Sequence, residues 1–365
     1  MKIGILGAGQ LARMIALAGY PLGLEFVFLD PSPEACAGKL GEHLVGAYDD
    51  LSMLAKLAAK SDVITYEFEN VPAHATEFIE RRTNNVYPPS NALNVSQDRL
   101  NEKNYFHDLG IPTSDYWTVD TFRDLKLAVF GKNYPFILKT RSFGYDGKGQ
   151  VFLNSEADLA SAWESLKDYA CILEAFVPFQ REVSIIAARS VSGEVKYYPL
   201  SENLHKGGIL RVAECRENDH LQAQAEDYVS RLLESLNYVG IIALELFDVD
   251  GKLLANEFAP RVHNSGHWTI EGAETSQFEN HLRAILDLPL GSTAAVGNAA
   301  MVNFIGGLPE TADVLAIDNA HLHLYGKSPR KGRKVAHVTV RTESKEQFEE
   351  SISNLKKLAD QVDES

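Results

Sequence analysis

The sequence predicts a multidomain protein of mixed α/β and α+β class, and three observations lead to this prediction. The chain has 365 residues, of which 45% are hydrophobic and 23% charged, so it is long enough for two or three globular domains. Its first hundred residues alternate short apolar runs with helical patterns, as parallel βαβ units do. Later strands instead flank glycine-containing turns such as Asp250-Gly251, which is typical of hairpins in a mixed sheet.

The first region supplies the elements of the parallel sheet. Strands are expected at Lys2–Leu6, Glu25–Leu29 and Val63–Tyr66, and helices at Gln10–Ala18, Leu51–Lys60 and Ala73–Arg82. Tyr87-Pro88-Pro89-Ser90 marks the exit from this unit, and a helix resumes at Asn101–Leu109.

Two further regions follow from the same patterns. The second is expected to contain strands at Phe136–Lys139, Gln150–Leu153 and Ala170–Glu174, with a helix at Glu156–Leu166. The third begins near Glu182, with strands at Val183–Arg189, Val195–Tyr198, Gly240–Phe247 and Leu253–Phe258 and a helix at Leu221–Leu236. Short strands at Ala299–Phe304 and Val335–Val340 and a polar helix from Ser344 complete the chain.

Composition excludes several classes of protein. A net charge of −15 argues against a general nucleic-acid surface. No segment approaches the roughly 20 apolar residues of a membrane span, and the start does not look like a signal peptide. Cys36, Cys171 and Cys215 have no disulfide or metal spacing and are expected to be buried thiols in a reducing compartment. We therefore expect a cytoplasmic protein without a membrane or nucleic-acid partner.

The N-terminal glycine turn allows two interpretations. Gly7-Ala8-Gly9-Gln10-Leu11-Ala12 follows a strand and opens a helix, and Asp30 ends the next strand, as in a dinucleotide-binding fingerprint. The physics requires only that backbone N–H groups at a helix N-terminus face an anion. NAD(P), another phosphorylated ligand and a turn needed only for packing all remain open at this point.

A second glycine-rich loop joins two strands of the second region. The segment from Lys139 to Gln150 contains three glycines, one aspartate and three basic residues, so it can cover phosphates with N–H groups and positive charge. It lacks the Gly-Lys-Ser/Thr of a Walker A loop. Lys139 ends an apolar strand, where a lysine is costly unless it meets an anion. A plain surface hairpin is the alternative.

Two glutamates predict a Mg²⁺ site. A three-residue loop centred on Gly251 would place Glu245 and Glu257 directly opposite each other on adjacent strands, where like charges repel unless a cation lies between them. Asn256 adds an oxygen, and such hard ligands suit Mg²⁺ bound to nucleotide phosphates. His263 and His267 are four residues apart, but a third zinc ligand with suitable spacing is missing, so zinc is disfavoured.

The motifs in combination resemble the ATP-grasp superfamily, and within it the N5-carboxyaminoimidazole ribonucleotide synthetase family. The segments that carry the resemblance are Gly7-x-Gly9-Gln10-Leu11, Thr65-Tyr66-Glu67-Phe68-Glu69-Asn70-Val71, Gln97-Asp98-Arg99-Leu100, Gly144 to Gln150, Asn256-Glu257, Ala259 to His267, Tyr325-Gly326-Lys327 and Gly332-Arg333-Lys334. Phe143 departs from the family, which usually has glycine there.

The resemblance implies an ATP-grasp fold with four parts and a tail. These are a Rossmann-like pre-ATP-grasp domain (1–97), a lid subdomain (98–178), a catalytic subdomain (179–290), a small β-rich C-terminal region (291–356) and a tail (357–365).

The resemblance also implies site residues, position by position. ATP contacts fall on Arg99, Lys139, Gly144, Tyr145, Asp146, Gly147, Lys148, Gly149, Gln150, Glu174, Ala175, Phe176, Val177, Glu182, His205, Asn256 and Glu257. Substrate contacts fall on Gly9, Gln10, Leu11, Glu67, Tyr145, Lys148, Lys327 and Arg333. Mg²⁺, or in its place Mn²⁺, falls on Glu245 and Glu257, and catalytic roles on Arg261, Asn264, Lys148 and Tyr145.

The implied reaction joins bicarbonate to 5-aminoimidazole ribonucleotide with ATP, through carboxyphosphate, in a homodimeric enzyme of purine biosynthesis. Three alternatives remain: an ATP-grasp ligase with another acceptor such as glycinamide ribonucleotide, an NAD(P)-dependent oxidoreductase built on Gly7, Gly9 and Asp30, and a nucleotide-binding regulator without turnover.

Overall fold

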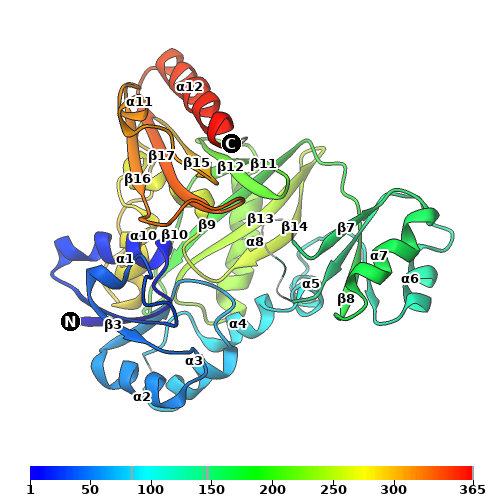
Figure 1. The fold of residues 1–365 in the computed structure, drawn as a ribbon, viewed down its shortest axis with the longest axis horizontal. Helices are drawn as coiled ribbons and strands as arrows, with labels where there is room; N and C mark the ends of the chain where they lie inside the picture. Colours follow the sequence, from blue (N-terminus) through cyan, green and yellow to red (C-terminus); the bar gives the residue numbers. More distant parts are fainter. Residues whose placement is uncertain (84, 143, 145–147, 364–365) are drawn as a thin grey trace.

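The computed structural model describes residues 1–83, 85–142, 144 and 148–363 and consists of three sheets with helices packed on them. In Figure 1 the N-terminal sheet is blue at lower left, the small lid lies at the right, and the large sheet runs between them towards the C-terminal helix at the top. The mixed α/β class with a parallel N-terminal sheet is confirmed.

The N-terminal sheet is parallel throughout, as predicted from its βαβ pattern. Its elements are β1 (Lys2–Leu6), α1 (Gln10–Gly19), β2 (Glu25–Asp30), β3 (Glu42–Val45), α2 (Leu51–Lys60), β4 (Val63–Tyr66) and α3 (Ala73–Glu80), in the strand order β3-β2-β1-β4. The sequence did not indicate β3, because this short edge strand has no buried residue and therefore no apolar run. Helix α4 (Ser90–Ser96) follows the sheet.

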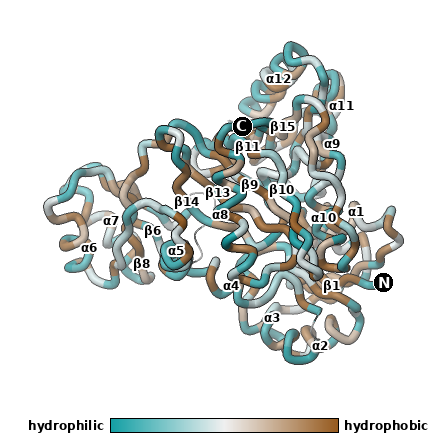
Figure 2. The backbone as a smooth tube through the Cα atoms, turned by 180° about the vertical axis from the view of Figure 1, so that it is seen from behind, coloured by the Kyte–Doolittle hydropathy of each residue, from teal (hydrophilic) through white to brown (hydrophobic). Residues whose placement is uncertain are grey.

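The lid is a four-stranded antiparallel sheet with helices on one face. After α5 (Arg99–Asp108) come β5 (Tyr116–Val119), α6 (Phe122–Val129), β6 (Phe136–Thr140), β7 (Gln150–Leu153), α7 (Leu159–Leu166) and β8 (Cys171–Ala175), in the strand order β5-β8-β6-β7. An apolar cluster that includes Leu125, Leu138 and Leu159 holds α6 and α7 on the sheet. Figure 2 shows teal, polar segments along the outer sides of these helices.

The large sheet has nine strands in the described residues and extends to the C-terminal region. Its strands are β9 (Arg181–Arg189), β10 (Val195–Tyr197), β11 (Leu200–Lys206), β12 (Ile209–Arg216), β13 (Gly240–Val249), β14 (Lys252–Ala259), β15 (Asn298–Ile305), β16 (Ala320–Leu324) and β17 (Lys334–Thr342). The order is β14-β13-β9-β11-β12-β15-β17-β16, with β10 beside β9. The β12–β15 pair therefore joins regions 179–290 and 291–356 into one sheet.

Helices cover both faces of this sheet. They are α8 (Gln222–Ser235), α9 (Thr269–Gly272), α10 (Gln277–Ile285), α11 (Thr311–Leu315) and α12 (Lys345–Asp363). Helix α12 continues to Asp363, so the segment predicted as a tail is helical over most of its length. Among the described residues, we find no helix with the length and apolar character that crossing a membrane requires.

The N-terminal domain and the large sheet share one hydrophobic core. Ile3 and Ile15 of the first sheet and its helix belong to the same buried cluster as Ile241 of β13 and Leu282 of α10. This shared core fixes the carboxyl end of the parallel sheet against the large sheet, because neither surface can separate without exposing apolar side chains to water.

Candidate active site

A cavity of about 1170 Å³ lies where the lid, the large sheet and the N-terminal domain meet. Its wall comes from the inner face of the lid, from strands of the large sheet, from the loops after β1 and β4, and from the basic segment before β17. Residues from opposite ends of the chain therefore form one continuous site.

One end of the cavity is apolar. Ile137 and Phe152 of the lid face it together with Phe176, Phe179 and Phe247. The rings of Phe179 and Phe247 stack with their centroids 4.8 Å apart and their planes 11° apart. A slot lined by flat and branched apolar side chains suits a planar heterocycle such as a purine.

The next part of the cavity is strongly charged. The Nζ atom of Lys139 lies 3.0 Å from Glu174 Oε2, and the Nζ atom of Lys103 lies 3.6 Å from the same oxygen. Burial lowers the pKa of Lys139. Burial would raise the pKa of Glu174, but the charges of Lys103, Lys139 and Arg99 bring it to about 2. The anion that a lysine at the end of β6 required is thus a carboxylate of the protein.

The carboxylate pair is confirmed, although by a different route from the one predicted. The turn has two residues, Asp250 and Gly251, both with positive φ (51° and 76°), and it pairs Val249 with Lys252. Without interruption this register would place Asn256 opposite Glu245. A bulge after Glu245 shifts the pairing by one residue, so that Glu257 faces Glu245.

Each carboxylate of the pair has a basic partner in the protein. Arg99 of α5 donates to Glu257 at 2.7 Å, and His263 Nε2 lies 3.1 Å from Glu245 Oε1. Burial would raise the pKa of Glu245, but the hydrogen bond and charge of His263, with the charges of His205 and Lys334, bring it to about 2. Glu245 is therefore a carboxylate anion at neutral pH, and Glu257 lies beside the Arg99 guanidinium.

These residues fit a Mg²⁺ ion but not a zinc centre. Two carboxylates and the Asn256 amide on one wall leave coordination positions for water and phosphate oxygens, as Mg²⁺ prefers. Within the part of the chain that the structure describes, no group of three or more His, Cys, Asp or Glu residues could hold a metal. Instead, His263 pairs with Glu245, and His267 packs against His337 with ring centroids 4.8 Å apart.

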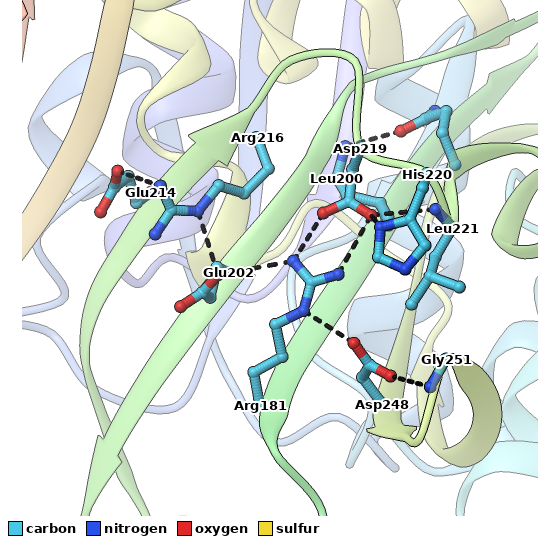
Figure 3. A network of polar contacts seen from close by, with 11 residues as sticks. Arg181, Leu200, Glu202, Glu214, Arg216, Asp219, His220, Leu221, Asp248 and Gly251 are labelled. Carbon is cyan, nitrogen blue, oxygen red and sulfur yellow. Dashed lines mark hydrogen bonds and ion pairs between the residues drawn. The ribbon is translucent and has the colours of Figure 1, made fainter.

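An ion-pair network fixes the strand ends near Glu182 and His205. Arg181, the first residue of β9, contacts Asp219 at 2.5 Å, Asp248 at 2.8 Å and Glu202 at 3.5 Å (Figure 3). Asp248 also accepts the Gly251 N–H, and Asp219 accepts the N–H of Leu221 just before α8. Next to this network, Glu182 lines the cavity and lies 2.8 Å from His205 Nδ1. The network therefore holds the strand that presents Glu182.

The N-terminal glycine turn binds a protein carboxylate. The N–H groups of Gly9 and Ala12 donate to Glu67, which is 7% exposed. A Cβ atom on Gly9 would lie 2.6 Å from Glu67 Oε1, so the glycine permits this approach. Asp30 accepts the Ala8 N–H at 3.0 Å. The N–H groups that a dinucleotide pyrophosphate would need are thus already bonded, and the oxidoreductase alternative loses its basis.

Arg261 and Asn264 are both held by partners far away in the sequence. The Nε atom of Arg261 donates to Glu69, which the sequence motif contains but to which we assigned no role. Asn264 exchanges two amide hydrogen bonds with the fully buried Asn303, at 3.2 and 2.7 Å. Both side chains therefore face the cavity in fixed orientations.

Basic residues gather at the end of the cavity beside the N-terminal domain. Lys327 donates to the side chain of Gln10, and burial lowers the pKa of Lys327. Arg333 donates to the Ser328 carbonyl and hydroxyl oxygens at 3.2 and 3.1 Å. Arg330, Lys331 and Lys334 line the same end. This concentration of cations suits a phosphorylated ligand.

Most of the predicted site residues line this one cavity. They are Gln10, Leu11, Glu67, Arg99, Lys139, Gly144, Lys148, Gln150, Glu174, Ala175, Phe176, Val177, Glu182, His205, Glu245, Asn256, Glu257, Arg261, Asn264, Lys327 and Arg333. Gly9 and Gly149 were also predicted but do not line the cavity. The Gly9 N–H donates to Glu67, and the Gly149 carbonyl accepts the Thr140 N–H at 2.8 Å. Tyr145, Asp146 and Gly147, like Phe143, lie outside the described residues.

Comparison with known proteins decides the family. The ATP-grasp domain model matches residues 104–278, the ribonucleotide synthetase preATP-grasp model residues 1–97, and the phosphoribosylaminoimidazole carboxylase C-terminal model residues 299–351. N5-carboxyaminoimidazole ribonucleotide synthase of Pseudomonas aeruginosa is 52% identical over 358 residues, covering 98% of this chain and 99% of the relative. The chain belongs to this synthase family. It is therefore an ATP-grasp ligase.

Solved structures of the family share the whole architecture. The Thermus thermophilus synthetase superposes with a TM-score of 0.93 at 53% identity, covering 98% of each chain. The Aspergillus clavatus synthase in complex with ADP and 5-aminoimidazole ribonucleotide superposes with a TM-score of 0.91 at 30% identity, covering 99% of each chain. The likeness thus includes the lid and the C-terminal region.

Proposed function

We propose that this chain carboxylates 5-aminoimidazole ribonucleotide with bicarbonate and ATP, forming N5-carboxyaminoimidazole ribonucleotide, ADP and phosphate in de novo purine biosynthesis. The observation that carries the proposal is the continuity of the cavity. It joins an apolar slot and a carboxylate pair, which suit Mg-ATP, to a basic end, which suits the ribonucleotide phosphate. A ligase needs both reactants within one enclosure.

Residue roles follow from positions along the cavity. Lys139, Glu174 to Val177, Glu182 and His205 would contact the nucleotide, with Lys148, Gln150 and Gly144 from the loop, and Arg99 behind Glu257. Glu245 and Glu257, with Asn256 beside them, would hold Mg²⁺ or Mn²⁺. Bound there, the metal would neutralise phosphate charge. Gln10, Leu11, Glu67, Lys327 and Arg333 would contact the ribonucleotide, the last two at its phosphate.

The chemistry proceeds in two displacements. A bicarbonate oxygen attacks the γ-phosphorus of ATP, the bond to the bridging oxygen breaks, and ADP leaves with that electron pair, giving carboxyphosphate. The amine of the ribonucleotide then attacks the carbonyl carbon, phosphate leaves, and one amine proton is released. Arg261 would offset charge on the transferring phosphoryl group. The enclosure would limit hydrolysis of carboxyphosphate, which is labile in water.

ADP release with Mg-ATP tests the proposal, with bicarbonate and 5-aminoimidazole ribonucleotide added singly and together. We expect release to require the ribonucleotide, and carbon from labelled bicarbonate to appear in the carbamate product. Stimulation by glycinamide ribonucleotide instead would favour the other acceptor. Failure of every acceptor in a sample that binds ATP would overturn the substrate assignment.

We also propose a cytoplasmic homodimer. Its support is the family resemblance and three cysteines without a disulfide partner, Cys36, Cys171 and Cys215. Light scattering of the purified protein would detect a dimer as twice the 40.3 kDa chain mass, and a monomer across micromolar concentrations would contradict it.

A further inference from the structure

The bulge in β14 decides where Glu257 points. In a regular strand, successive side chains alternate between faces. Ala255 and Phe258 both belong to the buried cluster on one face of the large sheet, whereas Asn256 and Glu257 both line the cavity on the other. Two consecutive residues can share a face here because Asn256 is the extra residue of the bulge. If β14 paired regularly through Asn256, the Glu257 side chain would point into the apolar core.

A bulged edge strand leaves backbone groups that need partners. Strand β14 is at the edge of the sheet, so its outward N–H and C=O groups have no neighbouring strand. The Ala255 N–H donates to the Pro112 carbonyl at 2.7 Å, and the Phe258 N–H donates to Glu102 Oε1 at 2.7 Å. Both partners come from α5 or the segment that follows it.

The two carbonyls at the bulge contact one lysine. Lys103 Nζ donates to the Asn256 carbonyl at 2.9 Å and to the Ala255 carbonyl at 3.4 Å. Its side chain is 2% exposed and also lies 3.6 Å from Glu174 Oε2. Burying a lysine amine is costly unless polar partners surround it, and these three oxygens are such partners.

We propose that Lys103 is a positioning residue, which holds the β14 bulge so that Asn256 and Glu257 both face the cavity where Mg²⁺ binds. Lys103 acts through the strand and not on the substrate. The inference rests on the metal assignment of the proposed function. It adds that metal binding in this enzyme depends on a side chain outside the cavity wall.

The test compares ADP affinity with Mg²⁺ and in EDTA, measured by titration calorimetry. The ratio of the two Kd values isolates the metal-dependent part of binding, so a general effect on the nucleotide slot, including one through Glu174, cancels. In Lys103→Met we expect this ratio to fall at least fivefold relative to wild type. Lys103→Gln, one atom shorter but polar, should show the same fall, and Lys103→Arg should recover at least half of the ratio.

Val229→Ala is the matched control. This fully buried residue of α8 belongs to the same apolar cluster as Ala255 and Phe258 but does not contact the cavity. It should lower the melting temperature and leave the ratio unchanged. The proposal would be overturned if Lys103→Met or Lys103→Gln folds and has the same ratio of Kd values as wild type. It would also be overturned if Mg²⁺ does not change the ADP affinity of the wild-type protein. ADP binding does not require the ribonucleotide acceptor. The test can therefore be interpreted even if the chain does not carboxylate 5-aminoimidazole ribonucleotide.

Discussion

Replacing Glu69 by glutamine should weaken catalysis by releasing Arg261. The two side chains form a salt bridge and are 30% and 14% exposed, respectively. Burial would raise the pKa of Glu69, but the charge and hydrogen bond of Arg261 hold it at about 2. Breaking a fully buried ion pair costs about 3–5 kcal/mol. Glutamine still accepts a hydrogen bond and the site is partly open to solvent. We therefore expect the free energy of unfolding to fall by about 1–2 kcal/mol and Tm to fall by about 1–3 °C.

The catalytic effect should exceed the effect on stability. A loosened Arg261 no longer meets the developing charge in a fixed position, and misplacement of about 1 Å can cost about 100-fold. We expect kcat/KM to fall about 10- to 100-fold in the ADP-release assay. Glu77→Gln is the control, because its i,i+4 pair with Arg81 is exposed and contributes less than about 0.5 kcal/mol.

The pH dependence of stability provides a second measurement on the same variant. Because the folded pKa of Glu69 is below its unfolded value, its stabilisation is complete at neutral pH and is lost as pH falls from about 4 towards 2. The Tm difference between wild type and Glu69→Gln should therefore stay constant at neutral pH and narrow as the pH is lowered from about 4 towards 2. Wild-type kcat/KM together with wild-type Tm in this variant would refute the reasoning.

Three further predictions concern other parts of the site. Glu257→Ala should nearly abolish turnover while the protein stays folded, and near-normal activity would count against the metal assignment. Asp219→Asn should lower Tm at pH 7, since Arg181 holds the pKa of Asp219 below its usual value against the opposing effect of burial; the deficit should shrink as pH falls below about 4, which thermal scans would detect. Gly9→Ala should destabilise the protein by about 1–3 kcal/mol, measured by urea unfolding, because its Cβ would meet Glu67, and an unchanged midpoint would contradict this.

Much of the fold could be predicted from the sequence, because apolar periodicity reports local structure. Strands β1, β2 and β4 of the parallel sheet and the β13–β14 hairpin were found in this way. Strands β11 and β12 were not found, because Glu202, Glu214 and Arg216 interrupt their apolar pattern. These residues pair with one another and with Arg181 across the sheet (Figure 3), and that pairing is visible only in three dimensions.

The site likewise has features that the sequence indicated and features that only the three-dimensional structure shows. The family motifs indicated most of the residues that line the cavity, and residue chemistry alone indicated the facing glutamates. The phosphate-binding role of the glycine-rich loop stays a prediction. The sequence could not show that a two-residue turn and a bulge, rather than a three-residue loop, bring Glu257 opposite Glu245. A one-residue bulge only shifts the alternation of polar and apolar residues by one position, and two adjacent polar residues such as Asn256 and Glu257 do not by themselves specify it.

By itself, the sequence determined the elements with clear apolar periodicity and the family, since each depends on residues close together in the chain or on motif order. Only the tertiary structure decided the partners: Arg99 for Glu257, 158 residues apart, Glu69 for Arg261, 192 apart, and Gln10 for Lys327, 317 apart. Such pairs form when domains dock through a shared apolar core, and many alternative partners of the same charge exist along the chain. Their selection therefore depends on packing, which no local pattern encodes.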